Sequence, residues 1–279
     1  MSMYLRPAGL DEALAALANS RLTVLAGGTD FYPARVGKPI DDDILDISAI
    51  ASLRGIRDEG NRWRIGATTT WSDLVAAELP PLFDGLKLAA REIGGMQIQN
   101  AGTIAGNLCN ASPAADGVPP LLALDARVEI ADAGGNKSVA LADFILGNRN
   151  TLLRPDQLLS AILIPKLAHP ARSHFVKLGA RKYLVVSIVI VAATLELEAR
   201  RVRTARVAVG AASAVAQRLP LLEAALIGKP WDAGLGKHVR PEHLSPLTPI
   251  DDVRASRDYR LDAGLTLVRR VLSQLGVHA

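Results

Sequence analysis

The stretch from Asn100 to Asp125, NAGTIAGNLCNASPAADGVPPLLALD, constrains this chain more than any other part of it. Small residues surround Thr103, and Asn107 and an Ala-Ser-Pro-Ala-Ala-Asp turn follow. Glycine has no Cβ and tolerates positive φ, so a phosphate or a flat ring can approach such a backbone closely. Successive free N–H groups form a concave anion-binding surface, and the Thr103 hydroxyl adds a donor. The sequence therefore predicts a loop shaped around an anionic or planar ligand.

A second small-residue loop, AGGTD from Ala26 to Asp30, follows the apolar run at 22–25. Two loops that each place glycine beside threonine are suited to bracket one diphosphate from two sides. Neither loop fits the P-loop pattern or the G-x-G-x-x-G pattern of dinucleotide-binding folds. A diphosphate repels a carboxylate, so Asp30 is expected to cap backbone N–H groups beside the ligand rather than to touch phosphate.

The two loops, with their order and contexts, resemble the FAD-binding subunit of the molybdenum hydroxylases (xanthine dehydrogenase, carbon monoxide dehydrogenase and relatives). In that family the first loop reads AGGTD, and the second reads T-[IL]-G-G-N followed by A-S-P-x-x-D. The resemblance covers essentially the whole chain. It implies an α+β protein with a two-subdomain FAD fold of the PCMH type (vanillyl-alcohol-oxidase-like), followed by a C-terminal α+β domain of the carbon monoxide dehydrogenase flavoprotein type. The expected boundaries are 1–55 and 56–167 for the two FAD-binding subdomains and 168–279 for the C-terminal domain.

The resemblance also assigns cofactor contacts on this chain, and no catalytic or metal-ligating residue. The expected FAD contacts are Val24, Leu25, Ala26, Gly27, Gly28, Thr29, Asp30 and Phe31 in the first loop; Gly102, Thr103, Ile104, Ala105, Gly106 and Asn107 in the second; and Ile93, Asp116, Leu159 and Lys177 outside them.

Four of these assignments have plainer alternatives, and one position departs from the family pattern. Ile93 and Leu159 are equally well explained as core residues, Lys177 as a solvated residue of an edge strand, and Asp116 as a cap for the following helix. Ala105 stands where the family usually has a glycine. Its methyl group favours negative φ, so the second loop must avoid the left-handed region at that position.

The resemblance further implies that the chain works within a complex. A large subunit with molybdopterin oxidises the substrate, and a small subunit carries two [2Fe–2S] clusters that reduce the FAD held here. The FAD then passes electrons to NAD⁺, oxygen, a quinone or another acceptor, and an (αβγ)₂ assembly is expected. Cys109 is the only cysteine. It cannot supply the four ligands of an iron–sulfur cluster, and a small buried thiol is its favoured interpretation.

Two rival functions remain open at this point. One is a free-standing FAD-dependent reductase, although the C-terminal part offers no recognisable set of proton donors for a substrate. The other is a non-catalytic scaffold subunit with degenerate loops, which only Ala105 favours. Substrate and final acceptor cannot be read from this chain.

Composition places limits on other classes of function. The 279 residues carry a formal net charge of +4, and the densest basic cluster, Arg200 to Arg206, is expected at a solvated hairpin turn or a subunit contact. The sequence has no basic stripe with interleaved aromatics, which is the pattern that would indicate nucleic-acid binding. The longest apolar run, 184–195, is too short to span a bilayer. The N-terminus lacks the apolar core of a signal peptide, so a cytoplasmic location is expected.

The remaining aromatic and imidazole candidates receive no functional assignment. Tyr183 is a possible stacking partner for the flavin ring, but a surface or interface tyrosine is favoured. No metal-ligand spacing links the histidines, which are His169, His174, His238, His243 and His278.

Several secondary elements can be predicted from pattern alone. Glycines at 134–135 indicate a hairpin with a loop longer than two residues, and Arg200-Arg201 a second hairpin turn. A helix is expected to begin at Pro220 and end at Gly228, and the leucine stripe at 261–275 indicates a C-terminal helix. Strands and helices in separate blocks favour α+β units over a doubly wound parallel sheet.

Overall fold

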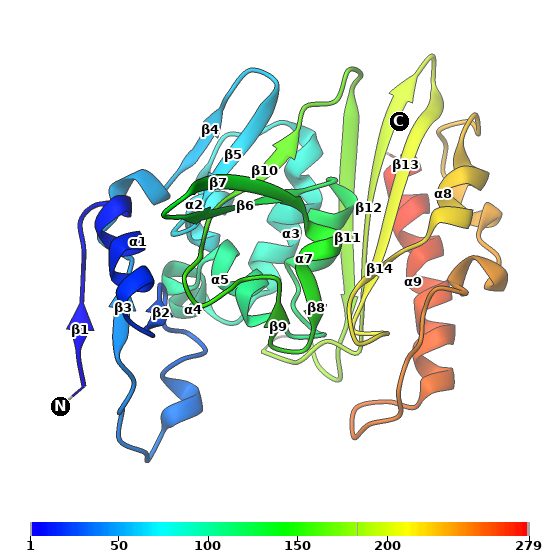
Figure 1. Cartoon of the computed structure of the whole chain (residues 1–279). Helices are drawn as coiled ribbons and strands as arrows, with labels where there is room; N and C mark the ends of the chain where they lie inside the picture. Colours follow the sequence, from blue (N-terminus) through cyan, green and yellow to red (C-terminus); the bar gives the residue numbers. More distant parts are fainter. Residues whose placement is uncertain (1, 183, 278–279) are drawn as a thin grey trace. The chain divides into compact units, whose positions relative to one another are not determined.

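The computed structural model describes residues 2–182 and 184–277, and its contacts group these residues into two compact units. The first unit comprises residues 1–77, 96–111 and 126–165, and the second comprises residues 78–95, 112–125 and 166–279. Both units mix strands with helices, as expected for an α+β protein (Figure 1). The three-part division with boundaries at 55 and 167 stays a prediction. Tyr183 and His278 lie outside the described residues.

The first unit begins with a small parallel sheet in the order β1-β3-β2, from strands β1 (Tyr4–Leu5), β2 (Thr23–Leu25) and β3 (Ile44–Asp46). Helix α1 (Leu10–Asn19) buries Ala13, Leu14 and Leu17 on one face. These side chains join Leu45 and other apolar residues in one core cluster. The spacing of the buried positions, three and four residues apart, is that of one helical stripe.

A five-stranded antiparallel sheet forms the rest of the first unit's β-structure. Its order is β4-β5-β10-β6-β7, with β4 (Ile56–Asp58), β5 (Arg62–Gly66), β6 (Arg127–Asp132), β7 (Gly135–Ala140) and β10 (Leu158–Pro165). The short helices α2 (Trp71–Ala76), α4 (Met96–Ala101), α5 (Ile104–Asn110) and α7 (Leu141–Phe144) and the β8–β9 hairpin (Ile145–Gly147, Asn150–Thr151) complete the unit. Thr70 caps α2 through a reciprocal capping box with Asp73.

The hairpin between β6 and β7 corrects one expectation. Asp132 pairs with Gly135, so the loop has only the two residues Ala133 and Gly134. The Asp132 side chain accepts a hydrogen bond from the Gly134 N–H at 2.9 Å. Gly135 adopts φ +119°. The side-chain contact and the glycine conformation together close a turn tighter than the glycine run indicated.

The second unit is built on an antiparallel sheet in the order β11-β12-β13-β14. Its strands are β11 (Ala171–Leu178), β12 (Val189–Glu198), β13 (Arg201–Gly210) and β14 (Gln217–Arg218). Alternate residues of β12 enter two cores: Val189, Val191, Ala193 and Leu195 lie in one, and Ile190 and Ala192 in the other. A strand buried on both faces reads as the continuous apolar run seen in the sequence.

Helices cover both faces of this sheet. Helices α8 (Pro220–Leu226) and α9 (Arg257–Val277) contribute to the larger core and run along β13 and β12 in Figure 1. Helices α3 (Asp84–Glu92) and α6 (Val118–Ala123) supply Ala89 and Ala123 to the other core. The predicted start at Pro220 and the long C-terminal helix are confirmed, and α8 ends at Leu226, two residues before Gly228 with its φ of +76°. No helix within the described residues is long and apolar enough to cross a membrane.

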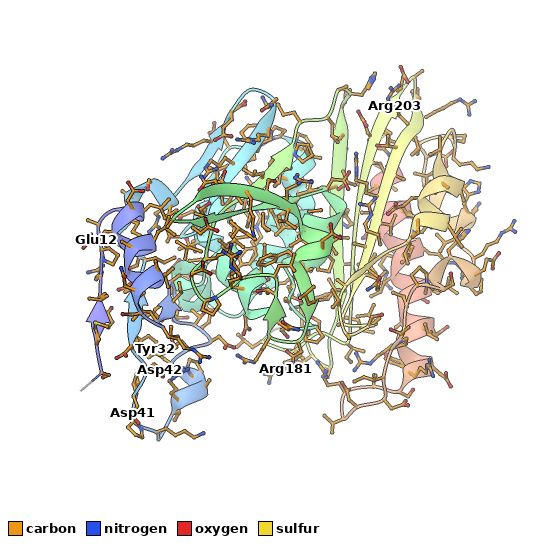
Figure 2. The ribbon with its side chains drawn as sticks, viewed as in Figure 1. Glu12, Tyr32, Asp41, Asp42, Arg181 and Arg203 are labelled. Carbon is orange, nitrogen blue, oxygen red and sulfur yellow. The ribbon has the colours of Figure 1, made fainter. Side chains whose placement is uncertain are left out.

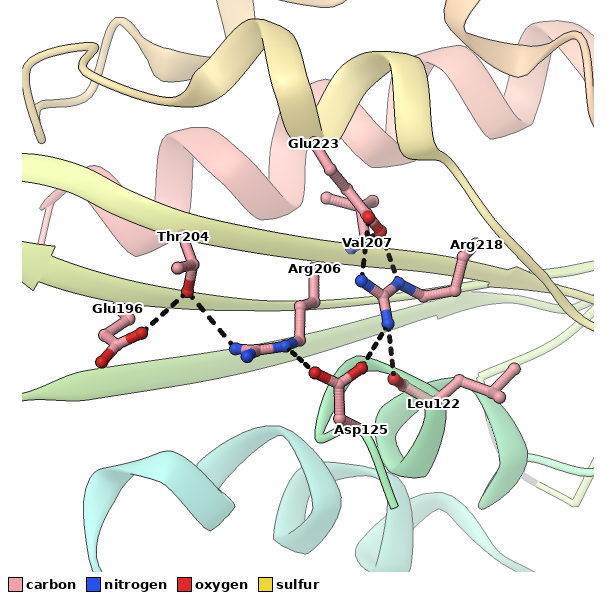
Figure 3. Close-up of polar contacts among 8 residues, drawn as sticks. All are labelled: Leu122, Asp125, Glu196, Thr204, Arg206, Val207, Arg218 and Glu223. Carbon is pink, nitrogen blue, oxygen red and sulfur yellow. Dashed lines mark hydrogen bonds and ion pairs between the residues drawn. The ribbon is translucent and has the colours of Figure 1, made fainter. Parts of the chain in front are cut away.

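The hairpin predicted around Arg200-Arg201 is present, with Ala199 and Arg200 as its loop residues because Glu198 pairs with Arg201. Most of the arginines of this cluster have partners within the chain. Arg203 pairs with Glu198, and Arg201 donates to the Gly228 carbonyl at 2.8 Å. Arg206 pairs with Asp125, as Figure 3 shows.

The Arg206–Asp125 pair belongs to a larger polar network in the second unit. Arg218 donates to Asp125 at 2.7 Å and also pairs with Glu223, whose carboxylate accepts from the Val207 N–H at 2.9 Å (Figure 3). The network joins the end of α6 to β13, β14 and α8. It therefore accounts for part of the basic cluster as structural.

Candidate functional site

The first predicted loop follows β2, whose parallel pairing with β3 holds its end in place. Gly28 has φ +68°, and a Cβ there would lie 2.6 Å from the Tyr32 ring. Within the described residues, the N–H groups of Gly27, Gly28 and Thr29 donate to no backbone or side-chain acceptor, although the Gly28 carbonyl accepts from the Tyr32 N–H at 3.1 Å. Adjacent N–H groups without protein partners suit an anionic ligand.

The segment after this loop is held by Arg35, which lies between an aromatic ring and a carboxylate. Its guanidinium carbon is 3.8 Å from the centre of the Phe31 ring, and its Nε donates to Asp42 at 2.7 Å. Tyr32 and Asp42 mark the two ends of this segment in Figure 2. A stacked and bidentate arginine fixes the direction in which the loop leaves the site.

The second predicted loop is anchored by backbone hydrogen bonds to the start of α2. The Trp71 N–H donates to the Gly102 carbonyl at 3.2 Å, and the Ile104 N–H donates to the Thr69 carbonyl at 3.0 Å. Thr103 caps α5 by accepting from the Gly106 N–H at 3.0 Å. No acceptor within the described part of the chain takes its own hydroxyl hydrogen, which is available to a ligand.

The structure brings the two loops together, which the sequence could only suggest. A Cβ added to Gly27 would lie 1.9 Å from the carbonyl oxygen of Ala101. A Cβ on Gly102 would lie 3.3 Å from Thr29 Oγ1. The backbones therefore approach each other as closely as only glycine allows, and both loops present donors at one place in the first unit.

One buried polar atom in the second loop has no protein partner. Asn107 Oδ1 makes no hydrogen bond within the described residues, although such atoms are nearly always paired in folded proteins. An unpaired amide oxygen in the second loop and free N–H groups in the first match a ligand that carries both donors and acceptors. The residues present thus fit the FAD that the resemblance implies.

Ala105 adopts a conformation compatible with its methyl group. It lies in the first turn of α5, is 4% exposed, and has no positive φ. The glycine that matters sterically is Gly106, where a Cβ would lie 2.7 Å from Thr103 Oγ1. The departure at Ala105 therefore leaves the loop intact.

Asp30 does not serve as the expected backbone cap. Its carboxylate receives two hydrogen bonds from Arg149, at 3.0 and 3.3 Å, and one from the Asn110 side chain at 3.3 Å. An arginine offers a planar pair of donors that matches the two oxygens of a carboxylate. The Asp30 carboxylate therefore binds Arg149 in preference to backbone N–H groups. Neither Arg149 nor Asn110 was marked by the sequence.

In the second unit, Asp116 and Lys177 form a buried ion pair. Lys177 Nζ donates to Asp116 Oδ2 at 2.8 Å and to the Glu92 carbonyl at 3.1 Å, and the two side chains are 6% and 11% exposed. Ser187 donates to Asp116 Oδ1 at 2.6 Å. The alternatives of a solvated Lys177 and a helix-capping Asp116 are therefore wrong, and Ser187 is a partner that the sequence did not mark.

Burial raises the pKa of the Asp116 carboxyl, and the Lys177 ammonium and the Ser187 hydroxyl oppose that rise. The charged form of Asp116 thus depends on Lys177 beside it. Lys177 has three N–H groups and uses two of them among the described residues, so one donor is left there for a ligand.

The other assigned residues are placed as follows. Leu159 is 2% exposed on β10, and Ile93 is a half-buried residue directly after α3. Contact of either with the cofactor stays a prediction. Cys109 lies on α5, and burial raises the pKa of its thiol to about 12, so it is not a reactive thiolate.

Two sequence families match the chain. Residues 1–167 match the FAD binding domain in molybdopterin dehydrogenase, and residues 174–275 match the CO dehydrogenase flavoprotein C-terminal domain. Among curated proteins, the xanthine dehydrogenase FAD-binding subunit of Escherichia coli is 31% identical over 97% of this chain and 94% of its own length. The glyceraldehyde dehydrogenase medium chain of Sulfolobus acidocaldarius is 30% identical over 98% of this chain and 97% of its own.

Solved structures show the same likeness across the whole chain. Carbon monoxide dehydrogenase from Hydrogenophaga pseudoflava superposes with a TM-score of 0.85 at 28% identity, covering 98% of this chain and 96% of the other. A crystal structure of Cu,Mo-CO dehydrogenase superposes with a TM-score of 0.89 at 26% identity, covering 100% and 98%. With both families matched in order along its length, the chain belongs to the FAD-binding medium subunits of the molybdenum hydroxylases.

Proposed function

We propose that this chain is the electron-relay subunit of a molybdenum hydroxylase complex, which accepts electrons at FAD and passes them to a separate acceptor. The observation that supports the proposal is the close approach of Gly27 to Ala101, which brings the free N–H groups of the first loop to the second loop, where Asn107 Oδ1 is unpaired within the described residues. FAD supplies the redox chemistry when bound, and the protein supplies its binding, orientation and electrostatic surroundings.

Each part of the cofactor is proposed to meet a different set of groups. The N–H groups at 27–29 and the Thr103 hydroxyl would hold the diphosphate, and Asn107 would bond a polar edge of the ligand. The remaining N–H of Lys177 would favour negative charge on the reduced ring. The full proposed set of contacts remains residues 24–31, 102–107, Ile93, Asp116, Leu159 and Lys177.

The proposed partners are those that the family likeness supports. We propose that a large subunit with molybdopterin oxidises the substrate, and that two [2Fe–2S] clusters on a small subunit deliver the electrons to this chain, in an (αβγ)₂ complex in the cytoplasm. The domain limits 1–55, 56–167 and 168–279 are retained in this proposal. The proposed acceptor is NAD⁺, oxygen, a quinone or another acceptor, and the proposed reaction class is that of dehydrogenases acting on CH or aldehyde groups.

The test is an absorbance spectrum of the natively purified protein, with co-purifying chains sized on a gel. Flavin bands with broad iron–sulfur absorption and two companion chains are expected. Flavin bands from this chain alone would favour a free-standing FAD-dependent reductase. A chain that stays colourless after incubation with FAD would leave the scaffold function.

Rapid mixing then identifies the acceptor. The complex is reduced anaerobically with dithionite, and flavin absorbance is followed after addition of NAD⁺, oxygen or a soluble quinone. Recovery of the oxidised flavin band with only one of them identifies the physiological class of acceptor. Equal, slow recovery with all three would exclude these three classes and indicate another acceptor, whereas failure of the flavin to become reduced in the first step would contradict the relay.

A further inference from the structure

A single arginine connects the two cofactor loops. Arg149 lies in the turn of the β8–β9 hairpin, 119 residues from Asp30 in sequence. Its guanidinium binds the Asp30 carboxylate of the first loop through both oxygens, at 3.0 and 3.3 Å. Its backbone N–H donates to the carbonyl of Ala111, which ends α5 of the second loop, at 3.3 Å.

The surroundings indicate that this arrangement is built rather than incidental. Arg149 adopts φ +54° and Ala111 adopts φ +47°, so both non-glycine residues hold a left-handed conformation where they meet. Such conformations cost free energy and persist where the surrounding contacts enforce them. Asn110 adds a third hydrogen bond to Asp30, at 3.3 Å, from the same end of α5.

Folding stability is a weak explanation for the ion pair. The side chains of Arg149 and Asp30 are 61% and 48% exposed. Exposed pairs of this kind contribute little to stability, because solvent screens them. The carboxylate, however, belongs to a loop whose free N–H groups suit a diphosphate, and an uncompensated carboxylate there would repel that ligand.

We propose that Arg149 is a positioning residue for FAD: it neutralises Asp30 and holds the first loop at the distance from α5 that the diphosphate requires. This inference rests on the proposed binding of the diphosphate by these loops. In this arrangement the Asp30 carboxylate is the group through which Arg149 holds the first loop in position.

The test measures FAD affinity of the apoprotein by flavin fluorescence, together with the midpoint of thermal unfolding without FAD. Arg149→Ala is expected to raise the Kd about tenfold, as one uncompensated charge near a dianion would. Its unfolding midpoint should change by no more than about 2 °C, since the pair is exposed. Arg149→Lys restores the charge without the planar fork and should recover part of the affinity.

The double variant Asp30→Asn/Arg149→Ala separates charge compensation from simple damage. Because the neutral amide does not repel phosphate, the double variant should bind FAD more tightly than Arg149→Ala alone. The loss of FAD affinity in Arg149→Ala should also become smaller as the salt concentration is raised, because salt screens the repulsion between Asp30 and the diphosphate. Arg154→Ala is the matched control: Arg154 is 56% exposed and pairs with Asp156 nearby in sequence, and its loss should leave the Kd unchanged.

Three results would overturn the inference. If Arg149→Ala binds FAD as tightly as wild type does, the inference about Arg149 is wrong, but the proposed function still stands. A double variant no better than Arg149→Ala, with no dependence on salt, shows loop damage rather than charge compensation. A wild-type chain that binds no FAD removes the proposed function as well, so the two failures are distinguishable.

Discussion

Lys177 Nζ lies 2.8 Å from Asp116 Oδ2, and both side chains are shielded from solvent by the second unit. The sequence assigned each residue to the cofactor separately, without indicating that they touch. Together with Ser187 and the Glu92 carbonyl they form one polar cluster. Any effect of Lys177 on a bound flavin therefore depends on the charge of Asp116.

Breaking this pair should destabilise the protein, and replacing Asp116 should have a larger effect than replacing Lys177. Asp116→Asn leaves a buried ammonium without its counter-charge and should lower the free energy of unfolding by about 3–5 kcal/mol. Lys177→Met should cost less, because Asp116 can take up a proton and burial already raises its pKa. Urea unfolding of the apoprotein at pH 7 measures both.

The pH dependence of Lys177→Met provides a second check on the same cluster. A carboxyl group whose pKa is higher in the folded than in the unfolded protein contributes to the free energy of unfolding. That contribution is fully present below the unfolded pKa, about 3.9, and is lost as pH rises through the folded pKa. The variant should therefore recover stability relative to wild type as pH falls. Asp156→Asn, in an exposed pair, is the control and should be as stable as wild type within the error of the measurement. Equal stability of Asp116→Asn and wild type would contradict the pair.

Gly27→Ala should separate the two cofactor loops. The new methyl carbon would lie 1.9 Å from the Ala101 carbonyl oxygen. A Cβ is fixed by its own backbone and the oxygen belongs to the backbone of the other loop, so the clash is relieved only if a loop moves. FAD binding, measured by equilibrium dialysis, should weaken at least about 100-fold because the phosphate donors no longer converge.

Gly9→Ala is the control for that substitution. No atom lies within 4 Å of a Cβ at Gly9, and its φ is −118°, so alanine fits. The control should bind FAD as wild type does. Normal binding by Gly27→Ala would mean that the loops do not meet in solution.

Ala105→Gly should destabilise the protein even though it restores the family's usual residue. Ala105 is buried in a helical turn, where glycine costs about 0.5–1 kcal/mol relative to alanine. FAD affinity should not improve, since the position uses no left-handed conformation. Calorimetry and FAD titration test both points, and tighter binding by the glycine variant would show that Ala105 restricts the loop.

The sequence was sufficient where a local rule determined the result. Glycine beside threonine marked both loops, and proline at 220 with glycine at 228 delimited α8. It was insufficient where the partner of a side chain lies far away in the sequence. Asp30 binds Arg149 and not the backbone N–H groups near it, and Asp116 binds Lys177, 61 residues away. Pairings of this kind depend on the tertiary fold, which carries no local signature.

The Arg64–Glu129 pair in the first unit should make stability depend on acidic pH. Arg64 binds both carboxylate oxygens of Glu129, at 2.9 and 2.7 Å, and Ser160 adds a hydrogen bond at 2.7 Å. The Arg64 guanidinium, with Ser160 assisting, holds the pKa of Glu129 below its usual value, although partial burial opposes this. The stabilisation is therefore present above the unfolded pKa, about 4.3, and is lost as pH falls through the folded pKa.

Glu129→Gln isolates this contribution from the other carboxylates. The amide keeps the size of the side chain but removes its charge, so at pH 7 the variant should lose about 1–3 kcal/mol of unfolding free energy. Urea unfolding at intervals from pH 7 to 3 should show wild type and variant converging at the acidic end, where Glu129 is protonated in both states. A constant difference across that range would mean that Glu129 does not depend on its charge for stability. Arg64 would then hold it by packing alone.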